Sequence, residues 1–307
     1  MSLAAPPAAP VNPQKKRRRR KGIRVPLWYI APALAIYLLL VIWPSVQGVG
    51  LAFTNWDGLS PDKEFVGLDN FQRLLEDPIG LDALLRTLFI AIALLILQNA
   101  FGLALALALN SRIKSRKILR TAFFAPAVLS SVVLGYMFQY IFSPTGPLNQ
   151  ILELLGLESL KRNWLGDPAY AVGVIVFVIV WQSVGSTMVI YLAGLQGVPA
   201  ELLEAASIDG AGPFRRFFSV TLPQLAPAVT INFMLTLIGG LRVFDQVFVL
   251  TRGGPANGTQ TISTLMIQQA FEFGRYGYGA AMAVVLTIMV AILSAVQYYL
   301  LRRQRTA

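Results

Sequence analysis

Two charged side chains interrupt an otherwise apolar stretch of this chain. Arg242 and Asp245 lie within residues 225–250, which contain no other charged residue. Each charge costs roughly 2.5 to 3.5 kcal/mol at the centre of a bilayer, so both should face protein or water. Residues three apart on a helix also lie close enough to pair. Two interpretations stay open: a structural ion pair, or side chains that line a polar cavity and bind hydroxyl or phosphate groups.

Other side chains in the apolar stretches could line the same cavity. Taken alone, a polar side chain in a membrane helix more often forms a hydrogen bond to a neighbouring helix, which stabilises the fold by about 0.6 kcal/mol. Aromatic residues there usually pack against neighbours or anchor at interfaces, although their faces could also cover a ring-shaped ligand. The polar candidates are Gln182, Ser183, Ser186, Thr187, Asn232 and Gln246. The aromatic candidates are Trp181, Tyr191 and Phe244.

The residue types that most enzymes use are missing. The chain has no histidine and no cysteine, which removes the commonest general base and metal ligand as well as disulfides, thiolate metal sites and cysteine nucleophiles. No paired acids occur inside the apolar stretches, and no G-x-x-x-x-G-K-[ST] motif for nucleotide occurs in the sequence. We therefore expect no catalytic residues, no metal site and no cofactor bound by this chain.

The composition places most of the chain in lipid. Apolar residues make up 55% of it, charged residues only 13%, and the mean hydropathy is +0.61. A membrane-crossing helix needs roughly 20 apolar residues, and six stretches meet that length. They are residues 26–53, 87–109, 121–142, 169–195, 225–250 and 277–301. We expect an all-α membrane protein in which residues 26–307 form six transmembrane helices.

The distribution of lysine and arginine predicts the orientation of these helices. With the N-terminus in the cytoplasm, eighteen cations fall on that side, and the opposite loops hold seven cations and eleven acids. Both termini are then cytoplasmic. The same asymmetry explains the net charge of +11 by membrane topology, without nucleic acid as a partner.

Residues 1–25 are predicted to be a separate cytoplasmic arm. The arm begins with an Ala/Pro-rich segment, and residues 15–24 are basic, which is typical of a disordered segment. The basic run can anchor beside anionic lipid headgroups. A cleavable signal peptide is disfavoured because the apolar run that follows is too long and lacks a convincing small-residue cleavage site. A nucleic-acid-binding arm would need a further partner.

A polar segment, residues 199–223, separates the fourth and fifth apolar stretches and has the sequence PAELLEAASIDGAGPFRRFFSVTLP. Pro199 suits the first turn of a helix of about eleven residues, and Gly210 suits the left-handed position that ends it. Gly212 and the proline after it then start a second short helix, which Pro223 should end. The charge distribution places this segment in the cytoplasm.

The spacing of this segment is similar to the signature loop of binding-protein-dependent ATP-binding-cassette (ABC) importer permeases. The similarity lies in Glu204-Ala205-Ala206, then Gly210, then Val220-Thr221-Leu222-Pro223, where the family usually has isoleucine in place of Val220. Three further stretches resemble the sugar branch of that family, the maltose, lactose and glycerol-3-phosphate type. They are FTNWDGLSPDKEFVGLDNFQRLLEDP, VFVLTRGGPANGTQTISTLMIQQAF and GYGAAMAVVL. The resemblance covers most of the chain beyond residue 26 and implies the type I ABC importer permease fold.

The resemblance implies a permease subunit of an ATP-driven importer for a sugar or sugar derivative, without catalytic activity of its own. Such a subunit forms half of the translocation pathway and works by alternating access. The implied partners are a second homologous permease, an ATPase dimer that binds ATP and magnesium, an extracellular or periplasmic sugar-binding protein, and membrane lipid. The implied location is the bacterial or archaeal cell membrane, the inner one where there are two.

The resemblance also assigns roles to residues. In that family the helix of the signature loop docks on the ATPase, and the loop after the fifth span lies beneath the binding protein. The ATPase-coupling residues would be Glu201, Leu202, Glu204, Ala205, Ala206, Asp209, Gly210, Gly212, Leu222 and Pro223. The docking candidates are Gly253, Gly254 and Pro255, in a tight turn that would present its backbone. The substrate-path candidates are Gln182, Ser186, Asn232, Arg242, Asp245 and Gln246.

Two other classes of membrane protein are weaker alternatives. An ion-coupled secondary transporter or channel should carry several acids near the midplane and often has repeated halves, whereas this chain has one charged pair and no evident repeat. A membrane-embedded enzyme would have to use carboxylate, lysine or serine chemistry.

Overall fold

The computed structural model describes residues 27–111 and 113–303, without the side chains of Leu27 and Arg303. The described residues are almost entirely helical. They contain no strand, and their one isolated β-bridge joins Thr54 to Phe65. The prediction of an all-α protein is confirmed.

The chain divides into two compact units, residues 1–46 and 47–307. The arm predicted for residues 1–25 lies outside the described residues. From Ala31 to Leu51 the chain is helical, and this run is long and apolar enough to cross a membrane. Its elements, with the turn before them, are a 3-10 turn Leu27–Tyr29, α1 Ala31–Tyr37, a π-helical turn Leu38–Ile42 and α2 Trp43–Leu51.

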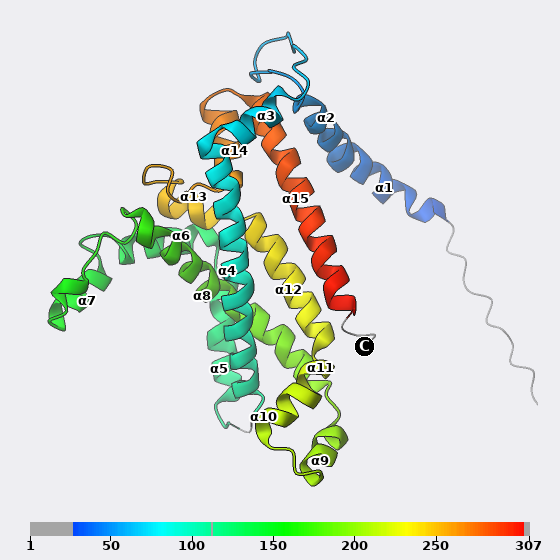
Figure 1. Cartoon of the computed structure of the whole chain (residues 1–307), viewed down its shortest axis with the longest axis vertical. Coiled ribbons are helices and arrows are strands. Elements are labelled where there is room, and N and C mark those ends of the chain that lie inside the picture. The colour runs from blue at the N-terminus through cyan, green and yellow to red at the C-terminus, as the bar shows by residue number, and fades with distance from the viewer. Residues whose placement is uncertain (1–26, 112, 304–307) are drawn as a thin grey trace, which may run out of the picture. The chain divides into compact units, whose positions relative to one another are not determined.

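Three more predicted spans correspond to long helices (Figure 1). These are α4 Pro78–Leu109, α8 Pro168–Gln196 and α15 Tyr276–Arg303. α4 begins well before the predicted residue 87, because the Asp77 side chain accepts a hydrogen bond from the Ile79 N–H (3.0 Å) and caps the helix. The sequence pattern predicts a later start because Asp82 and Arg86 are charged and interrupt the apolar run there.

The prediction of one continuous helix over residues 121–142 is wrong. Its two halves are bent by 97° relative to each other. Pro126 lies in the turn at the end of the first half, where it cannot donate a helical hydrogen bond, and Leu129 is extended with ψ 146°. The elements are α5 Arg116–Phe124, a 3-10 turn Ala125–Val128 and α6 Ser131–Ile141.

The prediction of one continuous helix over residues 225–250 is also wrong, because three non-helical residues interrupt it after Leu241. The interruption predicted at Pro223, before the fifth span begins, is found within two residues: the helix ends at Gln224, and the chain bends by 71° at Leu225. A π-helical turn lies directly before Leu222 and accommodates the missing proline N–H. The elements are α10 Pro213–Arg216, the π-helical turn Phe217–Thr221, α11 Leu222–Gln224, α12 Ala226–Leu241 and α13 Asp245–Thr251.

The described residues thus contain four helices able to cross a membrane, or up to six spans if each bent pair counts as one. Shorter elements connect them. These are α3 Asp69–Glu76, α7 Pro147–Leu154, a 3-10 turn Glu158–Leu160, α9 Ala200–Ile208, α14 Ile262–Ile267 and a π-helical turn Gln268–Glu272.

Helices α4, α8 and α12 pack against one another at the centre of the second unit (Figure 1). Glycines allow the closest approaches. A Cβ atom on Gly240 of α12 would lie 2.8 Å from the Cα of Ala91 in α4, and one on Gly185 of α8 would collide with the carbonyl oxygen of Phe123. Small residues of this kind let membrane helices approach closely, since lipid provides no hydrophobic drive for their association.

Candidate functional site

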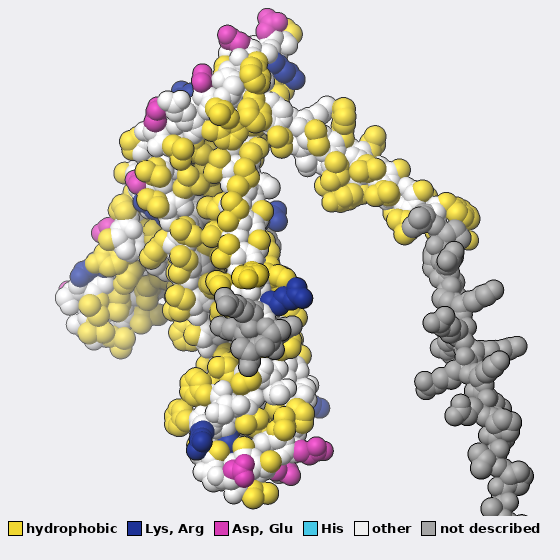
Figure 2. Space-filling model, turned by 45° about the vertical axis from the view of Figure 1, so that its right-hand side comes forward, with side chains coloured by type: hydrophobic (Ala, Val, Ile, Leu, Met, Phe, Trp, Pro, Cys, Tyr) yellow, Lys and Arg dark blue, Asp and Glu magenta, His cyan; other side chains and the backbone are white. Residues whose placement is uncertain are grey.

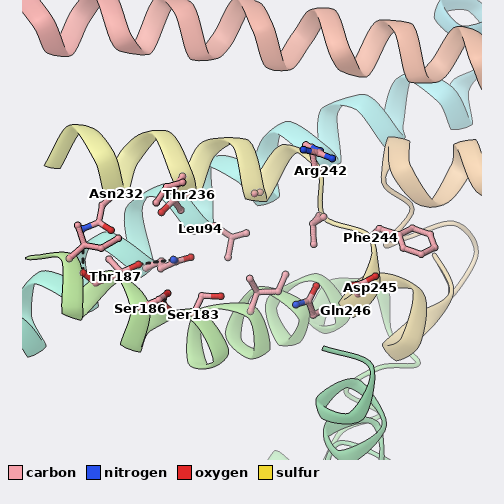
Figure 3. A pocket seen from close by; sticks show the side chains of 17 residues that line it. Leu94, Ser183, Ser186, Thr187, Asn232, Thr236, Arg242, Phe244, Asp245 and Gln246 are labelled. Atoms are coloured by element: carbon pink, nitrogen blue, oxygen red, sulfur yellow. Dashed lines mark hydrogen bonds between the residues drawn. The ribbon is translucent and has the colours of Figure 1, made fainter. Parts of the chain in front are cut away.

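A cavity of about 430 Å³ lies between α4, α8, α12 and the break before α13 (Figure 3). Its wall combines aliphatic side chains such as Leu94 and Ile179 with a larger set of polar ones. Five of the six predicted substrate-path residues line it: Ser186, Asn232, Arg242, Asp245 and Gln246. Ser183, Thr187 and Phe244 line it as well.

Arg242 and Asp245 do not form the ion pair that helical spacing would allow. Arg242 follows the last residue of α12 with φ −101°, and Asp245 starts α13, so the two are not on one helix. Both side chains are exposed, and they lie apart in Figure 3. Among residues 27–111 and 113–303 the one ion pair joins Lys161 to Glu153. The structure therefore does not show the structural pair: both residues line the cavity, and neither forms an ion pair with another described residue.

Gln182, the sixth candidate, acts behind the cavity wall. Its amide nitrogen donates to the carbonyl oxygen of Leu129 (3.1 Å) and to the hydroxyl of Ser131 (3.3 Å), at the bend between α5 and α6. Its amide oxygen accepts a hydrogen bond from the Gln246 side chain (2.9 Å). Because Gln182 is buried, it orients Gln246 at the cavity and ties α13 to the bend.

A second polar network crosses the three central helices at the other end of the cavity. Gln98 of α4 donates to the hydroxyl of Thr187 in α8 (2.8 Å), and Asn232 of α12 donates to the Thr187 carbonyl oxygen (3.3 Å). These side chains are all buried. Figure 3 shows Asn232 and Thr187 at one end of the cavity and Asp245 and Gln246 at the other.

Asn99 extends this network. Its amide oxygen accepts a hydrogen bond from the Tyr191 hydroxyl (2.8 Å), and its amide nitrogen donates to the Thr236 hydroxyl (3.3 Å). Sequence reasoning missed Gln98, Asn99 and Thr236. The signal was present, because Gln98 and Asn99 are adjacent amides in a stretch that is otherwise apolar from residue 88 to 109.

Of the three aromatic candidates, Phe244 lines the cavity. Tyr191 is buried in the network described above. Trp181 packs edge-on against Phe138, with ring centroids 5.2 Å apart. The last two therefore have the packing roles that aromatic residues usually have in membrane helices.

The predicted coupling segment forms a helix that contacts little of its own chain. α9 covers nine residues rather than the expected eleven or so, from Ala200 to Ile208. Gly210 adopts φ +75°, the left-handed conformation predicted for it, and Gly212 precedes the next helix as its cap. None of the α9 residues is buried. The exposed coupling candidates are Glu201, Leu202, Glu204, Ala205, Asp209, Gly210, Gly212 and Pro223, whereas Ala206 and Leu222 are half-buried.

Two large apolar side chains of this segment are strongly exposed, one at the end of α9 and one in α10. Ile208 is 86% exposed and Phe214 is 80% exposed. Sequence reasoning did not single these two out. An apolar surface of this kind on a short helix is typical of a site that another protein covers.

The loop after α13 places the docking candidates differently from the expectation. Gly253 is buried, and a Cβ atom there would collide with the Gln260 side chain, while Gly254 and Pro255 are half-buried. The exposed tip consists of Ala256 and Asn257. A contact of Gly253, Gly254 and Pro255 with the binding protein stays a prediction. In it, the buried Gly253 would contribute by allowing the tight turn and not by touching the partner.

Residues 98–306 match the family described as binding-protein-dependent transport system inner membrane component. The chain belongs to this family. The matched range contains the cavity-lining residues of α8, α12 and α13 as well as the α9 helix. Membership confirms the expected family and makes the chain a multi-pass membrane component of a transport system, which is not an enzyme.

Known relatives support the same assignment. The permease is 38% identical over 276 residues to the probable ABC transporter permease protein YurN of Bacillus subtilis, covering 89% of this chain and 94% of that protein. It is 36% identical over 275 residues to the multiple sugar-binding transport system permease protein MsmF of Streptococcus mutans, covering 90% and 94%. A chain of the bacterial alginate ABC transporter, solved in complex with a pentasaccharide-bound periplasmic protein, has the same fold, with a TM-score of 0.79 at 22% identity over 91% and 94% of the two chains.

Proposed function

We propose that this permease forms half of the translocation pathway of an ATP-driven importer for a sugar or sugar derivative. One observation carries the proposal: a polar cavity lies between α4, α8 and α12, and the loop that links α8 to α12 presents the exposed helix α9. The identity to MsmF, whose name describes a multiple sugar-binding transport system, supports a sugar as the substrate.

The cavity chemistry suits a ligand rich in hydroxyl groups. Arg242 supplies hydrogen-bond donors, Asp245 supplies acceptors, and Gln246 and Ser186 can do both. Apolar side chains between them, including Phe244, can cover the faces of a sugar ring. The volume of about 430 Å³ falls within the range of roughly 300–1,000 Å³ that is usual for small-molecule sites.

The α9 helix is the proposed contact with an ATPase. Gly210 turns the chain just after it with φ +75°, and the helices that lead into α12 follow. Movement of α9 by the ATPase would reach α12 and the cavity through the turn at residues 209–212 and the short helices up to the bend at Leu225. The acids Glu201 and Glu204 and the apolar Leu202 would form the contact.

The complete importer would contain further subunits. We infer a second, homologous permease for the other half of the pathway, an ATPase dimer that binds ATP and magnesium, and an external sugar-binding protein that delivers substrate. Alternating access would open the cavity first toward the binding protein and then toward the cytoplasm. The complex would reside in the bacterial or archaeal cell membrane, which is the inner membrane where two exist.

Uptake of radiolabelled sugar into proteoliposomes that contain the whole complex tests this proposal. Asp245→Asn and Arg242→Gln should each lower uptake by about tenfold, because each removes a charged hydrogen-bonding group from the cavity wall. The exchange Arg242→Asp with Asp245→Arg should not restore uptake, because the two side chains are not paired. Lys161→Gln removes a cation outside the cavity and serves as the control. Uptake that continues without the ATPase would rule the proposal out.

A further inference from the structure

The connection between α6 and α8 is a folded insert, residues 142–167, that contains α7. The buried side chain of Asn149 holds the two halves of the insert together. The Asn149 amide nitrogen donates to the carbonyl oxygens of Pro144 (3.0 Å) and Arg162 (2.9 Å). The amide oxygen accepts a hydrogen bond from the ring nitrogen of Trp164 (2.9 Å). Because these bonds join the chain before α7 to the chain after it, they fix the orientation of α7 in the insert.

One face of α7 is apolar and strongly exposed. Leu154 is 85% exposed, Leu155 is 66% exposed and Ile151 is 53% exposed. Residues three and four apart are neighbours on a helix, so these three side chains form one surface, the α7 apolar surface. Leu157 and Leu160 are exposed in the chain that follows. An exposed apolar area of this kind is typical of a site that a partner or a membrane covers.

The opposite side of α7 is polar. Asn149 and Glu153, four residues apart, lie on it, and Glu153 pairs with Lys161 (2.9 Å). In Figure 2 the part of the molecule at the left, where Figure 1 places α7, carries hydrophobic side chains along its lower side and charged ones above them. A helix with one apolar and one polar face can lie in a membrane–water interface, with the apolar face toward the hydrocarbon.

Aromatic residues place the insert at the level of a membrane surface. Tyr140 near the end of α6 and Tyr170 at the start of α8 are both exposed, and Trp164 packs edge-on against Tyr170, with ring centroids 5.9 Å apart. Tryptophan and tyrosine gather at membrane–water interfaces. The insert also lies on the side opposite α9, because α8 joins the two and is long enough to cross a membrane. The charge distribution predicts that α9 is cytoplasmic, so the insert is external.

An apolar stripe of α6 leads into the insert. α6 belongs to a bent helix pair that can count as one span, and Val133, Tyr136 and Tyr140 form an exposed stripe along it, which would face lipid. Five residues separate α6 from α7, so the α7 apolar surface follows closely along the chain. The insert carries three acids and two cations, and anionic headgroups would repel this small net charge only weakly.

We propose that α7 lies along the external surface of the membrane, in the plane of the bilayer, with the α7 apolar surface inserted among lipid acyl chains. The inference goes beyond the proposed function and needs neither the sugar nor the ATPase. It has a consequence for the cavity, because α6 packs against α13, whose first residues Asp245 and Gln246 line it. Lipid contact at α7 would hold this end of the cavity wall at a constant depth in the membrane.

Site-directed spin labelling of the whole complex, in liposomes of phosphatidylethanolamine and phosphatidylglycerol, tests the inference. The permease has no native cysteine, so Leu154→Cys, Leu155→Cys and Glu153→Cys each give it one labelling site, once any cysteines of the partner subunits are replaced. Molecular oxygen concentrates in hydrocarbon, whereas a water-soluble nickel chelate stays outside, and each relaxes the nitroxide labels that it reaches. The ratio of oxygen to nickel accessibility should be roughly tenfold higher at positions 154 and 155 than at position 153.

Leu59→Cys is the matched control for an exposed leucine. Leu59 is 92% exposed but lies in the external loop before α3, away from the insert. Its label should therefore give a low ratio, like that of Glu153→Cys, which separates exposure to water from insertion into lipid. All four substituted residues are exposed, so the variants should fold normally.

Three outcomes would refute the inference. Strong nickel accessibility at positions 154 and 155 would leave the α7 apolar surface in water. Low accessibility to both reagents there would mean that a protein, such as the second permease, covers this surface. A high oxygen ratio at position 153 as well would place the whole helix inside the hydrocarbon. None of these outcomes concerns sugar uptake, so the proposed function would stand in each case.

Discussion

The Asn99–Tyr191 contact offers the sharpest test of how the central helices are held together. The Tyr191 side chain is 1% exposed, and its hydroxyl donates a hydrogen bond to the Asn99 amide oxygen (2.8 Å). Asn99 also donates to the Thr236 hydroxyl on α12, at the longer distance of 3.3 Å. Asn99 therefore links α4 to both α8 and α12.

Substitutions at Tyr191 and at Asn99 should lower the free energy of unfolding by different amounts. Tyr191→Phe removes one interhelical hydrogen bond and should lower the free energy of unfolding by about 0.6 kcal/mol. Asn99→Leu removes two such bonds and also leaves the buried Tyr191 hydroxyl without an acceptor, which costs about 1 kcal/mol more, so the total should be about 2 kcal/mol. With both changes the Tyr191 hydroxyl is absent and no longer lacks an acceptor, so the loss should fall back to about 1.2 kcal/mol.

Unfolding in mixed detergent micelles, titrated with sodium dodecyl sulfate and followed by far-UV circular dichroism, measures these differences. The double variant should be more stable than Asn99→Leu alone, which is the distinctive outcome. Thr287→Val on α15 removes a hydroxyl that bonds only the Ala283 carbonyl oxygen of its own helix, and it serves as the control. Additive losses, or equal losses from both single changes, would refute this account of the network.

The remaining predictions concern the coupling helix and the bend behind the cavity. Gly210→Ala places a side chain at φ +75° with no atom within 4 Å, so strain alone should cost about 1 kcal/mol, and Gly210→Asn should cost less, both measured by the same unfolding titration. Glu204→Ala, at an exposed residue without a hydrogen bond, should leave stability unchanged but lower sugar-stimulated ATP hydrolysis by about tenfold, whereas an unchanged rate would contradict a coupling role. Gln182→Leu leaves the Gln246 amide nitrogen without its acceptor and should reduce uptake of sugar more than it reduces stability. Thr287→Val on α15, which does not line the cavity, is its control.

Proline shows what sequence patterns can and cannot predict about this fold. Apolar length was enough to find α4, α8 and α15, because any helix in lipid must cover the hydrocarbon. Pro44, Pro126 and Pro223 each predict a break in a helix, because proline lacks a backbone N–H, yet the helix is not interrupted in the same way at all three. The helix continues through Pro44, whereas the chain bends by 97° just after Pro126 and by 71° at Leu225, two residues after Pro223. The bend near Pro126 lies where Gly185 of α8 meets the backbone of Phe123, a tertiary contact that the local sequence does not reveal.

The candidate site was predictable to the extent that its residues are unusual for lipid. Arg242 and Asp245 were conspicuous because charges are costly at that depth, and both reach the cavity. Helical spacing left an ion pair between them open as one of two interpretations, and the structure does not show that pair, because the helix ends between them. The role of Gln182 needed the position of Leu129, which is 53 residues away in sequence and adjacent only in the fold.

The break after Leu241 and the cavity explain each other. Backbone that leaves a helix at membrane depth must find partners in protein or in water, because hydrocarbon offers none. Two of these backbone groups find hydrogen-bond partners within the chain. The Val243 carbonyl oxygen accepts from the Thr261 hydroxyl (3.4 Å), and the Val243 N–H donates to the Gly240 carbonyl oxygen (3.4 Å). Because both hydrogen bonds are long, the interrupted backbone also needs the polar surroundings that the adjacent cavity provides. Arg242 and Asp245 line this cavity, and under the proposed function they would meet water and substrate there, which would explain why two residues that are costly in lipid are retained.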